Sequence, residues 1–188
     1  HPGWSGSFGW ALHHLVPQVY RQRLPGRDRL SLGKGIHRQY RYILSVGRFI
    51  VERGFHTLIE AFSAVETDCR LVIVGDERFE RRYAARLRAC ADDRVLFPGF
   101  ISGPLLDELY GHCALYVLPS LVEGLPISLI EAMGYSRPLL ASDIPENVEV
   151  AGGIAAFFRR GDATDLARAL GELLAMPVDE RLATGASG

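Results

Sequence analysis

The sequence contains few of the residues that build metal sites or disulfide frameworks. Its three cysteines, Cys69, Cys90 and Cys113, are scattered and odd in number, and neither a C-x-x-C nor an H-E-x-x-H motif occurs. The sequence therefore indicates neither a zinc site nor a disulfide framework, and we predict no metal. Because free cysteines are typical of a reducing compartment, we expect a cytoplasmic protein.

Long apolar runs and a strong net charge are also missing. No apolar run approaches the roughly 20 residues that span a bilayer, no signal peptide is apparent, and the chain begins at His1, so we interpret it as a fragment. The formal net charge of −1 gives no global field to attract nucleic acid, and we predict no nucleic-acid partner. The 188 residues, 48% of them hydrophobic, suit one domain with its own core.

From residue 42 onward, short apolar runs alternate with stretches of helical spacing. Continuous apolar runs favour strands that are covered on both faces, and they occupy residues 42–46, 71–74, 95–97, 114–118, 138–141 and 154–158. The helical stretches are 55–65, 80–91, 102–112, 126–134 and 162–175. This alternation predicts an α/β fold, a Rossmann-like parallel sheet with helices on both faces. Residues 1–41 do not share it and are interpreted as a connector or a remnant of a preceding region, which leaves 42–188 as the domain.

Glycines and charged residues follow the predicted strands. In an open parallel sheet, ligands bind beyond the carboxyl ends of the strands. Arg48 and Arg53 bracket the loop after the first strand, and Gly47 opens it, so two guanidinium groups could hold a diphosphate beside a helix N-terminus. The alternatives are ordinary turn chemistry at each strand end and a surface Glu52–Arg53 pair. Gly47 and Gly54 lie seven positions apart, so the G-x-G-x-x-G fingerprint of nicotinamide dinucleotides is absent.

A second group of candidates lies in the stretch SLVEGLPISLIEAM, residues 120–133. Gly124 and Leu125 offer backbone N–H groups at the mouth of the predicted helix, whose apolar residues cover nearly every side and predict that it is buried. A buried carboxylate at Glu131 needs a donor, either from the protein or from the paired hydroxyls of a ribose. Glu123 would face the same cleft from the loop, and both carboxylates together suit a sugar nucleotide.

The motifs together resemble the C-terminal, donor-binding domain of the family 4 retaining glycosyltransferases, which have the two-domain GT-B fold. The resemblance covers residues 42–175 and is carried, in order, by ILSVGRFIVERGFHTLIEAF, LVIVGD, RVLFPGFIS, LYVLPSLVEGLPISLIEAMGYSRPLLASDIPE and GDATDLARAL. The E-x7-E spacing alone would be weak, but the set is specific. The fold it implies is the C-terminal half of GT-B.

The resemblance assigns a role to each matching position. It implies that Arg48 and Arg53, with the backbone of Gly47, Gly124 and Leu125, bind the donor diphosphate. It further implies that Glu123 is catalytic, beside the donor sugar. The nucleoside would lie against Phe100, Ile101 and Glu131. The family usually has Lys where this sequence has Arg53, and Arg keeps the charge while changing the reach.

The activity implied is transfer of a hexose or deoxyhexose from a nucleoside diphosphate, such as UDP or GDP, to an acceptor hydroxyl in polysaccharide or glycolipid synthesis. The partners implied are a nucleotide sugar and a glycan or lipid-linked acceptor, with no cofactor beyond the donor. The family's N-terminal domain, which carries most of the acceptor site, has no counterpart in these residues. Peripheral contact with the inner face of the membrane remains an alternative for the longer protein. Two other functions stay open: a non-catalytic nucleotide-binding or association module, and a GT-B sugar-nucleotide epimerase.

Overall fold

The computed structural model describes residues 41–177. The interpretation of residues 1–41 as a connector therefore falls, apart from Arg41, outside the described residues, as does the end of the predicted domain.

Six strands form one parallel sheet in the described part, in the order β3-β2-β1-β4-β5-β6. Their bounds are β1 (Tyr42–Val46), β2 (Arg70–Val74), β3 (Val95–Gly99), β4 (Leu115–Leu118), β5 (Leu139–Ser142) and β6 (Ala156–Phe158). Ile43 of β1 lies opposite Leu71 of β2 on one side and Leu115 of β4 on the other. The parallel α/β sheet predicted from the sequence is thus confirmed, with strand ends that differ by up to two residues.

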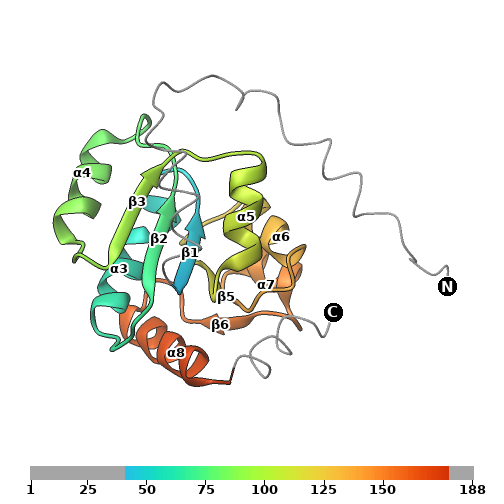
Figure 1. The fold of residues 1–188 in the computed structure, drawn as a ribbon. Coiled ribbons are helices and arrows are strands. Elements are labelled where there is room, and N and C mark those ends of the chain that lie inside the picture. Colours follow the sequence, from blue (N-terminus) through green and yellow to red (C-terminus); the bar gives the residue numbers. More distant parts are fainter. Residues whose placement is uncertain (1–40, 178–188) are drawn as a thin grey trace.

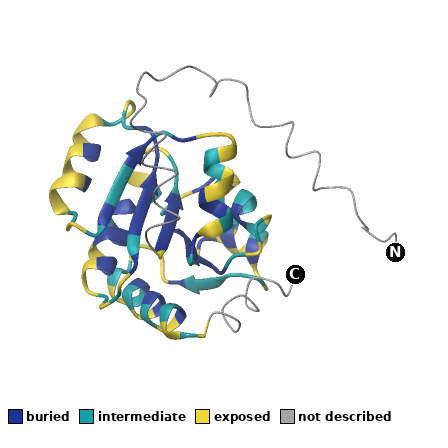
Figure 2. Cartoon of the chain, in the orientation of Figure 1, coloured by how far each residue is buried: buried dark blue, intermediate teal, exposed yellow. Residues whose placement is uncertain are grey.

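Helices cover both faces of this sheet (Figure 1). Alternate side chains of a strand point to opposite faces: Ile43 belongs to one apolar cluster with residues of α3, α4 and α8, and Leu44 to a second with residues of α5, α6 and α7. Figure 2 shows buried residues along the strands and exposed ones on the outer sides of the helices. The helices are η3 (Val51–Arg53), α3 (Phe55–Ser63), α4 (Arg81–Cys90), α5 (Pro104–His112), α6 (Ile127–Met133), α7 (Pro145–Ala151) and α8 (Ala163–Ala175).

Two expectations about the helices need correction. The sequence analysis did not predict α7, a helix of seven residues that begins at Pro145. It also predicted that the helix containing Glu131 is buried all round, but only Leu129 and Ala132 of α6 are buried. The side chain of Ile127 is 48% exposed, because the first turn of α6 lies at the open edge of the sheet.

The strand order places β1 next to β4 at the centre of the sheet. The chain winds outward from β1 through β2 to β3 and then crosses over to β4, so the direction of winding reverses between β1 and β4. Loops that leave two such neighbouring strands diverge to opposite faces, which opens a crevice for ligands at their carboxyl ends. The predicted site residues of the first and fourth strand ends therefore belong to one region.

Candidate functional site

The loops that follow β1 and β4 are in direct contact. Gly54 has a φ of 65°, a conformation that L side chains rarely adopt, and a Cβ atom there would lie 2.0 Å from the carbonyl oxygen of Pro119. The backbone N–H of Leu121 donates to the carbonyl of Glu52 over 2.7 Å. Because these contacts join residues on either side of Arg53 to the loop carrying Glu123, the two loops form one unit.

An ion pair between Arg53 and Glu123 crosses this unit. The Ser120 hydroxyl donates to Oε1 of Glu123 over 2.7 Å, and Glu123 is 6% exposed. The side chain of Arg53 is 19% exposed and lies at the surface end of the pair. This ion pair joins the two loops. The alternative drawn from the sequence was a surface ion pair between the neighbouring residues Glu52 and Arg53. A buried carboxylate is thus balanced by a guanidinium that reaches solvent.

A chain of hydrogen bonds supports this carboxylate from beneath. The Ser142 hydroxyl donates to the carbonyl of Ser120 over 2.5 Å, and the Asn147 amide donates to the carbonyl of Ser142 over 3.0 Å. Ser120, Ser142 and Asn147 are all 0% exposed. The sequence analysis assigned no role to Ser142 or to Asn147, which lies in the unpredicted helix α7. These bonds fix the loop that presents Glu123.

Glu131, in the second turn of α6, accepts a hydrogen bond from the hydroxyl of Tyr110 in α5 over 3.1 Å. Burial raises the pKa of Tyr110 well above its usual range, and the neighbouring Tyr116 and Glu131 raise it further. Tyr110 therefore stays protonated, and its single proton is shared between Oε2 of Glu131 and the more distant carbonyl of Ser128, 3.3 Å away. The sequence analysis left two kinds of donor open for Glu131, a protein group and the hydroxyls of a ribose. The structure shows a protein donor, the hydroxyl of Tyr110. The sequence analysis did not identify Tyr110.

Arg48 lies apart from the ion pair. Its guanidinium carbon is 5.4 Å from the ring centroid of Phe79, in the loop after β2, and the residue is exposed. Gly47, beside it, donates from its N–H to the carbonyl of Val74 over 2.9 Å, so the loop bearing Arg48 is tied to β2. The structure thus places both predicted arginines at the carboxyl edge, one paired with a carboxylate and one over an aromatic ring.

The remaining predicted positions line the same edge. Ile101 is buried and Phe100 is half-buried after β3. Gly124 and Leu125 are exposed at the mouth of α6, where the carbonyl of Leu125 accepts from the N–H of Ile127 over 2.9 Å. The roles of all these residues in donor binding, and of Glu123 in catalysis, remain predictions.

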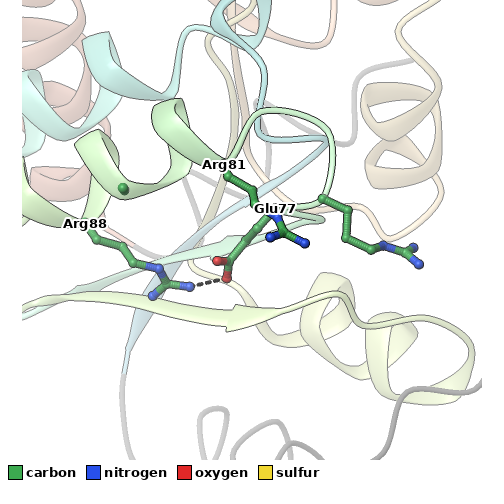
Figure 3. Close-up of a pocket in the computed structure, with 5 residues that line it drawn as sticks. Glu77, Arg81 and Arg88 are labelled. Carbon is green, nitrogen blue, oxygen red and sulfur yellow. Dashed lines mark hydrogen bonds and ion pairs between the residues drawn. The ribbon is translucent and has the colours of Figure 1, made fainter.

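A hollow of about 300 Å³ lies beside α4. In Figure 3 Arg88 reaches from the helix to Glu77, with which it forms an ion pair, and Arg81 lies next to them. The residues that line this hollow are Glu77, Arg78, Arg81, Ala85 and Arg88. None of them was predicted as a site residue, but Glu77 and Arg78 lie in the loop after β2, beside Phe79, which contacts Arg48.

The described residues contain neither a metal site nor a membrane-spanning helix. No group of three or more His, Cys, Asp or Glu residues among residues 41–177 could hold a metal ion. In the same part of the chain, no helix is long and apolar enough to cross a membrane.

The family model described as "Glycosyl transferases group 1" matches residues 40–176. The chain belongs to this glycosyltransferase family. The resemblance drawn from the sequence motifs is therefore confirmed. The carboxyl edge described above is the corresponding edge of a group 1 glycosyltransferase domain.

Curated relatives are sugar transferases by name. An alpha-D-kanosaminyltransferase of Streptomyces kanamyceticus is 37% identical over 110 residues, which are 54% of this chain and 28% of the relative. The serotype-specific mannosyltransferase WbdA of Escherichia coli is 30% identical over 141 residues, 71% of this chain and 17% of the relative. The chain thus spans less than a third of the length of these two relatives.

Solved structures confirm the fold. The Anabaena protein HepE, in complex with UDP and glucose, superposes with a TM-score of 0.74 at 20% identity. The superposition covers 87% of this chain and 47% of the HepE chain. Sucrose-phosphate synthase of Thermosynechococcus elongatus gives a TM-score of 0.70 at 26% identity, covering 87% of this chain and 43% of its own. These neighbours are GT-B glycosyltransferases, so the described residues have the fold of one half of GT-B.

Proposed function

We propose that this chain is the nucleotide-sugar donor-binding domain of a retaining glycosyltransferase that transfers a hexose or deoxyhexose to an acceptor hydroxyl. The observation that supports this most is the Arg53–Glu123 ion pair, held by Ser120 where the winding of the sheet reverses. Ligands of open parallel sheets bind at this position. The pair places a cation and a carboxylate side by side, which suits a phosphate joined to a sugar.

Each residue has a role in the proposed reaction. Arg48 and Arg53 bind the diphosphate and stabilise the negative charge that develops on it as the bond to the sugar breaks. Glu123 lies beside the sugar, and Glu131 accepts from ribose hydroxyls. The complex of HepE with UDP and glucose supports a nucleotide sugar as the ligand. The proposal needs no cofactor beyond this donor, and it places the acceptor site in a further domain.

A thermal-shift experiment tests the binding half of the proposal. Purified chain is heated with UDP, GDP, ADP and dTDP, each over a range of concentrations. The matching nucleotide should raise the melting temperature, with about 2.7 kcal/mol of stabilisation at a hundredfold excess over its Kd. Arg48→Ala should abolish the shift, because the exposed guanidinium contributes charge to the ligand.

Arg82→Ala provides the matched control. Arg82 is an exposed arginine on α4. Its substitution removes the same positive charge as Arg48→Ala, but at a position away from the carboxyl edge, so the nucleotide should still raise the melting temperature. If no nucleotide stabilises the chain, the donor-binding function is wrong and an association module is favoured. Equal losses in both variants would show that only net charge matters.

A further inference from the structure

We propose that Tyr110 is a positioning residue for the nucleoside half of the donor: its hydroxyl holds Glu131 in the orientation in which the carboxylate accepts hydrogen bonds from ribose. The inference rests on the proposed function. It adds a residue from a different helix that raises the affinity for nucleotides but not the affinity for pyrophosphate.

The Tyr110 hydroxyl is held in place by the packing of its ring. Tyr110 is 2% exposed, and its ring stacks on that of Tyr135, with centroids 5.3 Å apart and planes 11° from parallel. On another side it packs against Tyr116, at a centroid distance of 5.5 Å. The donor to Glu131 is therefore part of a rigid aromatic layer between α5 and α6.

A contact of this kind matters for Glu131 because its carboxylate ends a flexible side chain. The terminal torsion of a glutamate is broad, so an unrestrained carboxylate samples many orientations. The hydroxyl of Tyr110 is 3.1 Å from Oε2 and selects one of them before the ligand arrives. A carboxylate has about four acceptor positions, so the bond from Tyr110 does not exhaust its capacity for a ribose diol.

The expected change in affinity applies only to ligands that contain a nucleoside. Immobilising one flexible side chain on binding lowers affinity by roughly two- to tenfold. If Tyr110 immobilises Glu131 in advance, loss of its hydroxyl weakens any ligand that contacts Glu131 by such a factor. Pyrophosphate, which would contact only the arginine side of the site, should be unaffected.

Isothermal titration calorimetry of the whole chain with UDP, GDP and pyrophosphate tests this inference. We expect Tyr110→Phe to weaken the nucleotide that binds roughly two- to tenfold and to leave pyrophosphate unchanged. Tyr135→Phe is the matched control, because it also removes a hydroxyl from the aromatic layer, one that donates to Asp107. It should leave the affinities for nucleotide and pyrophosphate unchanged, with urea unfolding reporting the stability of each variant.

A double substitution separates positioning from a merely structural role. If Tyr110 acts through Glu131, adding Tyr110→Phe to Glu131→Ala, which leaves no side-chain acceptor at position 131, should cause no further loss of nucleotide affinity. An additional loss in the double variant, or an equal loss of nucleotide and pyrophosphate in Tyr110→Phe, would overturn the inference and leave the proposed function standing. Failure of the unsubstituted chain to bind any of UDP, GDP, ADP and dTDP would overturn both.

Discussion

The buried ion pair makes Arg53 a poor probe of ligand binding. The side chain of Glu123 is 2% exposed, and removal of one partner from such a pair leaves an uncompensated buried charge that destabilises the fold strongly. Loss of function in Arg53→Ala would therefore mix unfolding with loss of phosphate binding. Arg48 is exposed and lies over Phe79, so its substitution reports on binding more directly.

His56, at the start of α3, predicts how stability changes with pH. Its Nδ1 lies 2.8 Å from the Tyr83 hydroxyl. Burial lowers the pKa of His56, nearby Arg86 lowers it further, and Glu60 raises it in part. Because the folded pKa is below that of the unfolded chain, the unfolded state binds more protons as pH falls below about 6.5. His56 therefore contributes stability at neutral pH that is lost on acidification.

Urea unfolding at pH 7.5 and pH 5.5 measures this loss. His56→Gln should show a smaller drop in the free energy of unfolding between the two pH values than the unsubstituted chain. The same substitution at the exposed His112 should leave the drop in place. An undiminished drop in His56→Gln would mean that another group titrates in this range.

At the level of single residues, the sequence located the charged groups but not what holds them. Glu123 and Arg53 could be proposed because each follows a predicted strand, and parallel strands end at one edge. Tyr110 lies 21 residues from Glu131, and its contact depends on which side of α5 faces α6. That packing is decided by the whole aromatic layer, and no local pattern encodes it.

Among the elements, the junction of η3 with α3 decides whether the site can form. Gly54 lets the chain turn with a positive φ while the backbone of Pro119 passes directly against it. The sequence pattern gave strand and helix types reliably because apolar runs and helical spacing differ in period. It missed α7, because the seven residues Pro145–Ala151 have only Val148, Val150 and Ala151 as apolar residues besides the proline, too few to show helical periodicity.

Gly54→Ala tests the importance of this junction. The added methyl group would collide with the carbonyl of Pro119, and alanine disfavours the required φ, so we expect a loss of at least about 1–3 kcal/mol in the free energy of unfolding. Chemical denaturation measures it. Gly124→Ala, where a Cβ meets nothing within 4 Å, is the control and should be nearly neutral. Similar stabilities of the two variants would contradict the close approach of the loops.

At the scale of the whole molecule, we propose that this chain supplies the donor edge and that a further domain supplies the acceptor region. It corresponds to 47% of the HepE chain in the superposition. We therefore expect the isolated 188 residues to bind nucleotide but to transfer sugar poorly or not at all. Release of nucleoside diphosphate from UDP- and GDP-sugars, with simple acceptors, measures this. Robust transfer by the isolated chain would refute the assignment of acceptor binding to another domain.

The adjacency of β1 and β4 has a consequence for biosynthesis. The Ser45 hydroxyl donates to the carbonyl of Val117, 72 residues further along the chain. Until the ribosome has released β4, the first strand can pair only with β2, and its other edge stays open. The nascent chain therefore carries an open edge on β1 while the residues up to β4 are made, a period in which this edge is exposed to aggregation.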